Sequence, residues 1–281
     1  MKERIVVISD SDFTYIRNFI HENAAIVLEP GKVYLVESRL QPVAQHYGFA
    51  SISDMIAEMR AQPLDDIHQS VVEAMTTHET CFFRDVYPFE LLKKKILPDL
   101  IQRRASERRL GLWCGAASSG QEPYSVSMIL RDHFSRLSNW KIRFIATDLS
   151  KKMLERCRKG RYSQLEVNRG LAAPLLVKYF RRLGTEWQIK DELRRMIDFR
   201  ELNLAQPWPA LPPADVVFMR NVLIYFNTET KRDVLAKIRK VLKPDGYLLL
   251  GAAETTLGID ESFKRVALEE GCYYQIDETR T

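Results

Sequence analysis

The sequence predicts an α/β fold in which a doubly wound sheet follows a small all-helical domain. From Leu110 onward, apolar runs of strand length alternate with stretches of helical periodicity, which indicates a mostly parallel sheet with helices on both faces. Before Thr76, only the helical periodicity occurs. The 281 residues are enough for one large or two modest domains with a substantial core.

Residues 1–75 are expected to form the helical domain. Apolar side chains recur there at helical spacing in four stretches: Phe13–Ile20, Leu35–Tyr47, Ser53–Met59 and Ile67–Met75. No catalytic pattern accompanies them, so we interpret this domain as a packing or partner-docking unit. Residues 76–85 break the periodicity and are expected to form a linker.

Residues 86–281 are expected to form the α/β domain. Strands are predicted at Leu110–Trp113, Ile142–Thr147, Met196–Phe199, Val216–Met219, Tyr247–Leu250 and Cys272–Ile276. Helices are predicted at Tyr124–Phe134, Lys151–Lys159, Thr230–Leu242 and around Glu261–Val266. We expect the last helix and the last strand to return the chain to an edge of the sheet. The basic and aromatic residues 160–195 do not fit the alternation and are expected to form an inserted subdomain.

The formal net charge of +5 hides an asymmetry between the two parts of the chain. Residues 1–76 carry 6 Lys and Arg against 11 Asp and Glu, whereas residues 77–281 carry 36 against 26. The basic residues are either solvated helix faces or a surface that attracts an acidic macromolecule. Nucleic acid and glutamate-rich protein helices both fit that sign.

The composition otherwise points to a cytoplasmic protein without a metal site. The four cysteines show no C-x-x-C spacing, which favours reduced thiols. No apolar run reaches the ~18 residues that a membrane span needs, so no membrane insertion is expected. The apolar run at the N-terminus is too short for a signal peptide.

The segment Cys114–Tyr124 is the most informative stretch, because a turn of small residues joins a predicted strand to a predicted helix. Such a turn lets a ligand approach the backbone at a helix N-terminus. The spacing of Gly115 and Gly120 imitates a Walker loop, but Gln121 and Glu122 occupy its Lys and Ser/Thr positions. The G-x-G-x-x-G fingerprint of NAD-linked dehydrogenases is also missing. A carboxylate here favours a cationic ligand, and S-adenosylmethionine carries a sulfonium and an ammonium group.

Two further polar positions follow predicted strands. Asp148 ends the second strand, where an acid can accept hydrogen bonds from both ribose hydroxyls of a nucleoside. Alternatively, Asp148 or Ser150 is a helix N-cap. Asn203 and Leu204 follow the third strand, where an amide and a backbone N–H could bind adenine, although Asn203 also suits a simple turn.

The fourth strand ends in an apolar stretch that Arg220 and Asn221 interrupt. Half-buried polar groups at such a place need partners, and a ligand can supply them. Tyr225 lies further along the same loop and is either a site residue or a core aromatic.

Taken together, these stretches resemble CheR-type chemotaxis receptor methyltransferases. The resemblance covers nearly the whole chain, including the helical domain and the inserted subdomain. Each motif alone is weak, but their combination in this order is specific. The matching motifs are Thr76–Asp85, Gly120–Ser125, Ala146–Asp148, Asn203-Leu204, Arg220–Phe226 and Leu242–Gly246.

The resemblance implies an S-adenosylmethionine-dependent protein-glutamate O-methyltransferase with a Rossmann-like domain. Such an enzyme esterifies glutamate side chains on the cytoplasmic helical domain of membrane-bound chemoreceptors, in chemotaxis or chemosensory signalling, and releases S-adenosylhomocysteine. We expect no metal, no nucleic-acid partner and a monomer. An RNA or small-molecule acceptor, or a non-catalytic cofactor-binding module, are the alternative readings.

The resemblance also implies roles for individual residues, including some in the linker 76–85. The implied cofactor-binding residues are His78, Thr80, Arg84, Glu122, Asp148, Asn203, Leu204, Asn221 and Val222. Thr80, Arg84 and Glu122 would hold the methionine part, and Asn221 with Val222 would form the pocket floor. The implied catalytic residues are Arg84 and Tyr225.

The sequence departs from the family pattern at two places. His78 stands where the family usually has asparagine, so its contact would depend on pH. Members that dock on a pentapeptide at the receptor's C-terminus carry a longer, glycine-rich loop in the inserted subdomain. The corresponding stretch Phe180–Trp187 is short and has one glycine, so we expect no pentapeptide tether.

Overall fold

The computed structural model describes residues 8–269 and 271–280. By its contacts the chain divides into two units. The first unit contains the described residues up to Thr77 together with Tyr225–Thr230. The second unit contains His78–Ile224 and the described residues from Lys231 onward.

The first unit is helical, and all four helices expected there are confirmed. They are α1 (Asp10–Ala24), α2 (Val33–His46), α3 (Ile52–Ala61) and α4 (Asp66–Met75), with a short 3-10 helix at Pro30–Lys32. The side chains of Ser9, Ser51 and Asp65 accept backbone N–H groups at the starts of α1, α3 and α4, so the sequence itself marks these starts. Ile16, Ile20, Leu40, Met55 and Val71 form the fully buried core beneath them.

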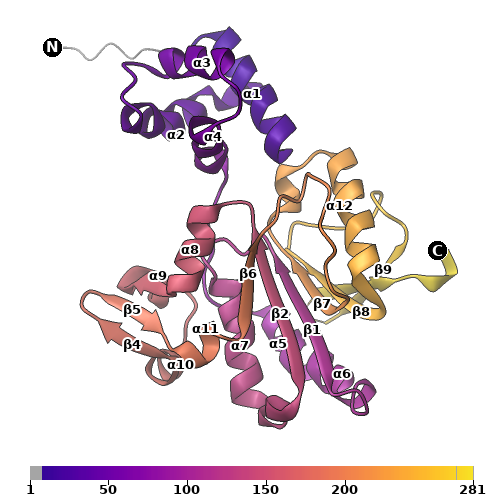
Figure 1. Ribbon diagram of the computed structural model, residues 1–281. Helices are drawn as coiled ribbons and strands as arrows, with labels where there is room; N and C mark the ends of the chain where they lie inside the picture. The colour runs from indigo at the N-terminus through magenta and orange to yellow at the C-terminus, as the bar shows by residue number, and fades with distance from the viewer. Residues whose placement is uncertain (1–7, 270, 281) are drawn as a thin grey trace. The chain divides into compact units, whose positions relative to one another are not determined.

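The second unit contains a seven-stranded sheet with the strand order β6-β2-β1-β7-β8-β10-β9 (Figure 1). The strands are β1 (Arg109–Gly115), β2 (Lys141–Asp148), β6 (Ile197–Glu201), β7 (Ala214–Met219), β8 (Leu242–Leu250), β9 (Phe263–Leu268) and β10 (Gly271–Ile276). The neighbours from β6 to β8 are parallel, whereas β10 pairs antiparallel with both β8 and β9. The predicted mostly parallel sheet is confirmed.

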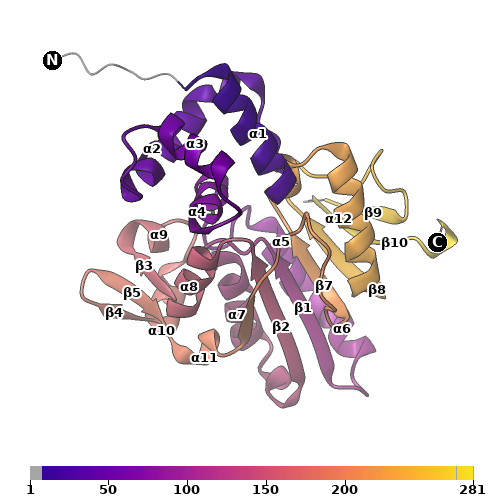
Figure 2. The ribbon, with the colours of Figure 1, turned by 45° about the horizontal axis from the view of Figure 1, so that its top comes forward.

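Helices pack on both faces of this sheet, as Figure 2 shows with α12 on one face and α5 to α7 on the other. The helices are α5 (Tyr87–Leu91), a π-helical turn (Leu92–Ile96), α6 (Leu97–Arg103), α7 (Gln121–His133), α8 (Lys151–Lys159) and α12 (Thr228–Val241). Single 3-10 turns occur at Ser135–Asn139, Leu223–Tyr225 and Glu278–Arg280. The helices within Tyr87–Arg103 are not among those that the sequence patterns predict.

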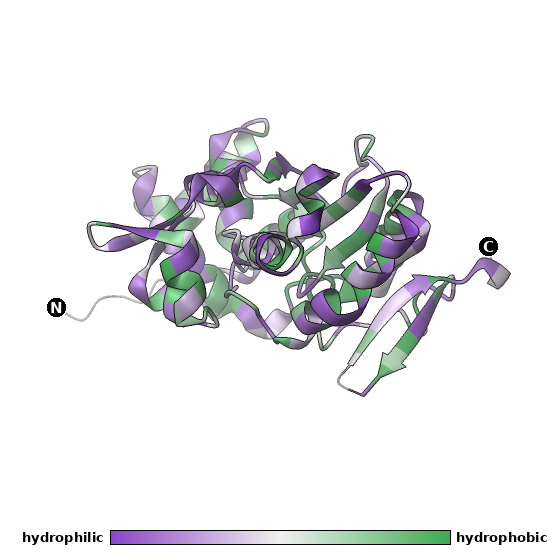
Figure 3. Cartoon of the chain, turned by 90° about the horizontal axis from the view of Figure 1, so that it is seen from below, coloured by the Kyte–Doolittle hydropathy of each residue, from purple (hydrophilic) through white to green (hydrophobic). Residues whose placement is uncertain are grey.

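Both faces of the central strands are apolar, which explains why the strands read as continuous apolar runs. Leu112 and Cys114 belong to a core cluster shared with α5, α6 and α7. Trp113 between them is also buried, although it lies outside that cluster. Because successive side chains of a strand point to opposite faces, each central strand buries two apolar faces. Figure 3 shows hydrophobic residues along these strands, whereas hydrophobic and hydrophilic residues are mixed along the hairpin next to the C-terminus.

The inserted segment forms a second, three-stranded antiparallel sheet of order β3-β5-β4. Its elements are β3 (Arg161–Ser163), α9 (Gln164–Asn168), α10 (Ala173–Tyr179), β4 (Phe180–Leu183), β5 (Glu186–Ile189) and α11 (Asp191–Arg194). The ring of Phe82 packs 5.1 Å from that of Tyr162 and 5.7 Å from that of Phe180. The segment before α5 is therefore anchored on this small sheet.

Two expectations about the end of the chain are wrong. The helix predicted around Glu261–Val266 is the strand β9, and the strand at Cys272–Ile276 does not form the edge, because β10 lies between β8 and β9. Six residue pairs join β9 to β10. Cross-strand pairing with β10 outweighs the local helical pattern, since it satisfies backbone groups that β10 would otherwise expose.

Candidate active site

The carboxyl ends of the central strands bring the predicted site segments to one edge of the sheet. Gly115 at the end of β1 pairs with Thr147 of β2 on one side and with Met219 of β7 on the other. The turns that contain the candidate residues start at these positions. Gly120 has a φ of 94° and immediately precedes α7, which is a conformation that favours glycine.

Asp148 holds the small-residue turn after β1. Its side chain is buried, with Oδ2 accepting from the N–H of Ser118 at 2.7 Å and Oδ1 from that of Ser150 at 2.9 Å. Ser118 Oγ in turn donates to the backbone carbonyl of His78 at 2.8 Å. Ser150, whose side chain accepts from the N–H of Met153, is the N-cap of α8. The side chain of Ser150, not that of Asp148, therefore caps α8.

Glu122, in the first turn of α7, forms a buried ion pair with Arg220 at the end of β7. Arg220 is 1% exposed and its Nη1 donates to Glu122 Oε2 at 2.6 Å. Its Nη2 donates to Asp85 Oδ2 at 2.7 Å and to the carbonyl of Arg84 at 3.0 Å. Burial raises the pKa of Glu122, and the Arg220 guanidinium offsets part of this increase. Arg220 therefore joins α7, β7 and the linker.

The linker itself adopts an unusual backbone. Phe83, Asp85 and Val86 all have positive φ angles, of 49°, 66° and 49°. For a β-branched residue such as Val86 this conformation is a genuine outlier, and such strain is retained where the surrounding contacts enforce it. The N–H of Phe83 donates to Ser125 Oγ of α7, and Arg84 Nη1 donates to the carbonyl of Glu79 at 2.8 Å. These contacts hold the linker in a tight turn.

The loop after β7 is organised by Glu254, a residue that the sequence patterns did not single out. Glu254 Oε2 accepts from the N–H groups of Asn221 at 2.7 Å and Gly251 at 2.6 Å. Its Oε1 accepts from those of Val222 at 2.8 Å and Leu223 at 2.7 Å. Glu254 is buried, and Asn221 adopts a left-handed φ of 58°. A single acid among small residues after an apolar strand, as in Gly251–Thr255, is the signal that could have identified it.

Asn203 forms a turn, which is one of the two roles that the sequence suggests for it. Its Oδ1 accepts from the N–H of Ala205 at 2.9 Å, which is an Asx turn. Leu204 is buried, and its carbonyl accepts from Trp208 Nε1 at 3.2 Å. The preceding residue, Leu202, donates its N–H to the carbonyl of Asp148 at 3.0 Å. The segment therefore starts beside Asp148, and a role in binding adenine stays a prediction.

Tyr225 belongs to the first unit by its contacts, unlike the other candidate residues. It ends a 3-10 turn, and its carbonyl accepts from the N–H of Val27 at 2.9 Å. The catalytic role expected for Tyr225 stays a prediction.

Acids outnumber cations at this edge of the sheet. We call the group the carboxyl-edge cluster; its members are Arg84, Asp85, Glu122, Asp148, Arg220 and Glu254. Four carboxylates face two guanidinium groups, and a cationic ligand would compensate the difference. The donor chemistry thus fits S-adenosylmethionine. Within the described part of the chain, no group of three or more His, Cys, Asp or Glu could hold a metal ion, and no helix is long and apolar enough to cross a membrane.

Comparison with known proteins places this site in a family. A model of the CheR methyltransferase all-alpha domain matches residues 11–76, and a model of the CheR methyltransferase S-adenosylmethionine-binding domain matches residues 78–272. The chain is 41% identical over 269 residues to chemotaxis protein methyltransferase Cher2 of Pseudomonas putida, covering 94% of this chain and 97% of that protein. It is 40% identical over 272 residues to chemotaxis protein methyltransferase 1 of Pseudomonas aeruginosa, covering 95% and 98%.

A solved TehB-like S-adenosylmethionine-dependent methyltransferase from Corynebacterium glutamicum is 9% identical, with 69% of this chain and 97% of that chain covered and a TM-score of 0.38. The two domain models match in order along the chain and together account for most of its length. This protein belongs to the CheR methyltransferase family, whose catalytic domain binds S-adenosylmethionine.

Proposed function

We propose that this chain methylates glutamate side chains of membrane-bound chemoreceptors, forming γ-glutamyl methyl esters. The observation that carries the proposal is the surplus of carboxylates in the carboxyl-edge cluster, which suits a cofactor with a sulfonium and an ammonium group. The relatives named chemotaxis protein methyltransferases support a chemoreceptor as the acceptor. When bound, S-adenosylmethionine supplies an electrophilic methyl group.

The proposed cofactor contacts follow from the geometry of the second unit. Glu122 attracts the ammonium group, while Arg220 holds its carboxylate in place. Asp148, which ends β2 beside the small-residue turn, accepts the ribose hydroxyls. The loop shaped by Glu254 forms the pocket floor. The remaining proposed cofactor contacts are His78, Thr80, Arg84, Asn203, Leu204, Asn221 and Val222.

The acceptor needs orientation rather than activation. A solvated glutamate has a pKa of about 4.3, so it is already ionised at neutral pH and no general base is required. The protein lowers the barrier by holding the carboxylate in line with the methyl group, about 3 Å away, and by excluding water. Arg84 can hold a carboxylate through its guanidinium N–H groups, because among the described residues only its Nη1 is engaged, with the Glu79 carbonyl. We assign a second donor, the phenolic hydroxyl, to Tyr225.

The charge of the chain after residue 76 supports an acidic protein as substrate. Residues 77–281 carry 36 Lys and Arg against 26 Asp and Glu. Opposite charge on the acceptor raises the encounter rate and makes it depend on salt. Methylation that is indifferent to ionic strength would contradict this part of the proposal.

We also propose that methylation does not depend on a pentapeptide at the receptor's C-terminus. Leu183 pairs with Glu186, so only Gly184 and Thr185 form the turn between β4 and β5. Gly184 has a φ of 62°, as a two-residue hairpin turn requires. This turn leaves no extended loop for a peptide to dock on. Tight binding of a receptor-tail peptide in calorimetry would overturn it.

The deciding experiment combines purified protein, tritiated S-adenosylmethionine and cytoplasmic fragments of chemoreceptors. Base-labile methanol released from the receptor measures the glutamyl ester. We expect Arg84→Ala to reduce the rate by about 100-fold with little change in melting temperature, since it removes an orienting group. The exposed Arg136→Ala is the matched control and should leave both unchanged. Label in RNA but not in receptor, or a rate loss that only follows unfolding, would refute the proposal.

A further inference from the structure

A cavity of about 570 Å³ lies beyond the carboxyl ends of β7 and β8, within the second unit. Its wall is formed by the loop that follows β8, including Gly251, Glu254 and Leu257. Arg265 of β9 and Tyr274 of β10, which pair with each other across the hairpin, close the opposite side. A volume of this size lies within the range of specific ligand sites and exceeds what one side chain fills. None of the residues proposed to bind ribose or adenine lines it.

The cavity adjoins the proposed cofactor site through Arg220. Arg220 lines the cavity while its Nη1 holds Glu122. Its Nε is buried and has no hydrogen-bond partner among the described residues. A buried guanidinium N–H without a partner is costly and marks a place where a polar ligand group can bind. A ligand in this cavity would therefore lie beside the cofactor rather than replace it.

The wall of the cavity is held in place by hydrogen bonds. Glu254 binds the N–H of Gly251 within its own loop and three N–H groups of the loop after β7. A Cβ added at Gly251 would lie 2.7 Å from Glu254 Oε2 and 2.9 Å from the Asn221 nitrogen, so the two loops meet closely. Thr256, between the lining residues Thr255 and Leu257, is fully buried. The cavity is thus preformed.

Two cations, Arg220 and Arg265, line the cavity together with two carboxylates that are already engaged. The carboxylate of Glu254 is occupied by backbone N–H groups, and that of Asp85 is paired with Arg220. Arg265 is exposed, and its side chain interacts with Cys272 and Tyr274 rather than with a described carboxylate. Leu257, also in the wall, is 60% exposed, which provides an apolar contact next to the charge. An acidic side chain flanked by an apolar one matches this lining.

We propose that this cavity is the acceptor subsite, which receives the reacting glutamate of a receptor helix together with an apolar neighbour. Arg220 and Arg265 attract the acidic side chains, and Leu257 contacts the apolar face of the helix. Arg84, whose carbonyl accepts from Arg220 and which precedes the lining residue Asp85, still orients the reacting carboxylate. The inference rests on the proposed function, because it concerns the substrate of that reaction. It adds a binding site for the acceptor that shares Asp85, Arg220 and Glu254 with the carboxyl-edge cluster but contains none of the residues proposed to bind ribose or adenine.

Arg265→Glu tests the subsite, and Lys264→Glu is its matched control. The two residues are neighbours in β9, both exposed, and point to opposite faces of the strand, and only Arg265 lines the cavity. Arg265→Glu should raise the KM for a receptor fragment by about tenfold, and Lys264→Glu by less than about twofold. The affinity for S-adenosylhomocysteine, measured by calorimetry, should not change in either variant. Equal effects of the two variants on KM would overturn the subsite.

A steric variant provides a second measurement that does not depend on charge. Ala253 is exposed and lines the cavity, so the bulky side chain of Ala253→Trp should obstruct part of it. We expect methylation to fall by at least about tenfold while S-adenosylhomocysteine still binds. Wild-type methylation by Ala253→Trp would overturn the subsite.

Receptor fragments with Gln in place of Glu at the methylated positions separate the two proposals. The wild-type protein loaded with S-adenosylhomocysteine should bind the Glu fragment more tightly than the Gln fragment, and Arg265→Glu should lose that preference. If the wild type methylates no receptor fragment, the proposed function fails. If it methylates the receptor but Arg265→Glu keeps the Glu preference, only the acceptor subsite fails.

Discussion

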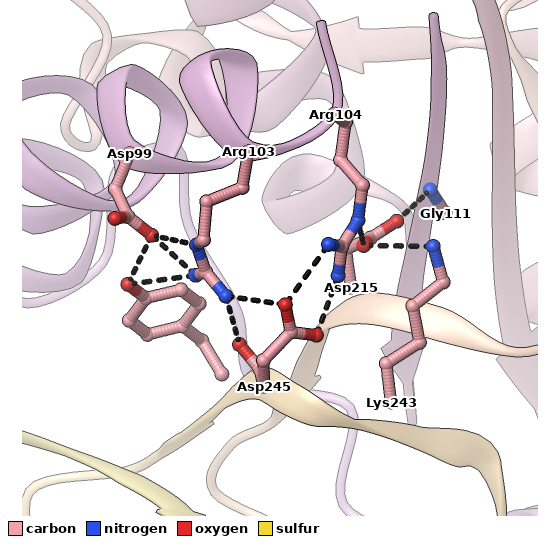
Figure 4. Close-up of polar contacts among 8 residues, drawn as sticks. Asp99, Arg103, Arg104, Gly111, Asp215, Lys243 and Asp245 are labelled. Atoms are coloured by element: carbon pink, nitrogen blue, oxygen red, sulfur yellow. Dashed lines mark hydrogen bonds and ion pairs between the residues drawn. The ribbon is translucent and has the colours of Figure 1, made fainter. Parts of the chain in front are cut away.

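Two clusters of charged side chains lie at opposite ends of the same parallel strands, and they differ in balance. The amino-edge cluster, shown in Figure 4, consists of Asp99, Arg103, Arg104, Asp215, Lys243 and Asp245. It pairs three acids with three cations. The carboxyl-edge cluster has four acids and two cations. We infer that charges matched within the protein stabilise the fold, whereas a surplus of carboxylates over guanidinium groups indicates where a cationic ligand binds.

The amino-edge cluster is saturated by contacts within the protein. Asp215 is fully buried and accepts from Arg104 Nε at 2.8 Å, Lys243 Nζ at 3.0 Å and the N–H of Gly111 at 2.7 Å. Arg103 and Arg104 both bind Asp245. The register between β7 and β8 shifts where Lys243 and Asp245 lie, so a bulge brings them to this cluster. The cluster thereby ties α6 to the starts of β1, β7 and β8.

The largest expected effect concerns Asp215. Asp215→Asn should lower the free energy of unfolding by about 3 kcal/mol or more, because it leaves the buried Arg104 with one carboxylate fewer. The affinity of the folded variant for S-adenosylmethionine should stay unchanged. Urea denaturation and calorimetry measure the two quantities. The control Asp198→Asn removes an exposed pair with Arg200 and should cost less than about 1 kcal/mol. A loss of cofactor affinity in folded Asp215→Asn would break the comparison between the clusters.

Asp148→Asn is expected to have the opposite profile. It should weaken S-adenosylmethionine binding by about 100-fold, because it removes a charged acceptor for the ribose hydroxyls. The free energy of unfolding should fall by only about 1 kcal/mol, since one oxygen can still accept a backbone N–H. Calorimetric titration alongside urea denaturation measures both. An unchanged dissociation constant would remove Asp148 from the cofactor site.

The raised pKa of Glu122 predicts how cofactor binding depends on pH. Burial favours the protonated form, so Glu122 loses its charge at a higher pH than an ordinary glutamate does. As the pH falls, protonation removes the negative charge that attracts the ammonium group. We expect the affinity for S-adenosylmethionine to fall by about tenfold between pH 8 and pH 5. In Glu122→Gln the affinity should be low at both pH values; an unaltered pH profile in that variant would contradict the assignment.

The smallest expected effect concerns Asp245. Hydrogen bonds from Arg104 hold the pKa of Asp245 below its usual range. The carboxylate therefore contributes stability above the ordinary aspartate pKa of about 4, and this contribution is lost as the pH falls through the lowered pKa. Because the side chain is 42% exposed, Asp245→Asn should cost only about 1 kcal/mol at pH 7. Urea denaturation at several pH values should show the difference from the wild type shrinking below pH 4; a constant difference would argue against this charge effect.

The spacing of apolar residues was sufficient to predict the helices and strands whose structure depends on residues close in sequence. The four helices of the first unit and the central strands were predicted because apolar periodicity encodes the buried faces. The strands β1 and β2 place Gly115 and Asp148 at one edge because parallel strands end together. Periodicity could not identify β9, because its strand state depends on pairing with β10.

The fold class, the glycine turn and the acid after the second strand could be predicted from the sequence, because each depends on residues that are close along the chain. Which charged side chains meet depends on the folded sheet. Glu122 and Arg220 lie 98 residues apart in sequence, and Glu254 reaches Asn221 across 33. Burial makes such contacts strong, but no local pattern records them. The partners of Glu122 and Asn221, and with them the shape of the site, follow from the folded sheet.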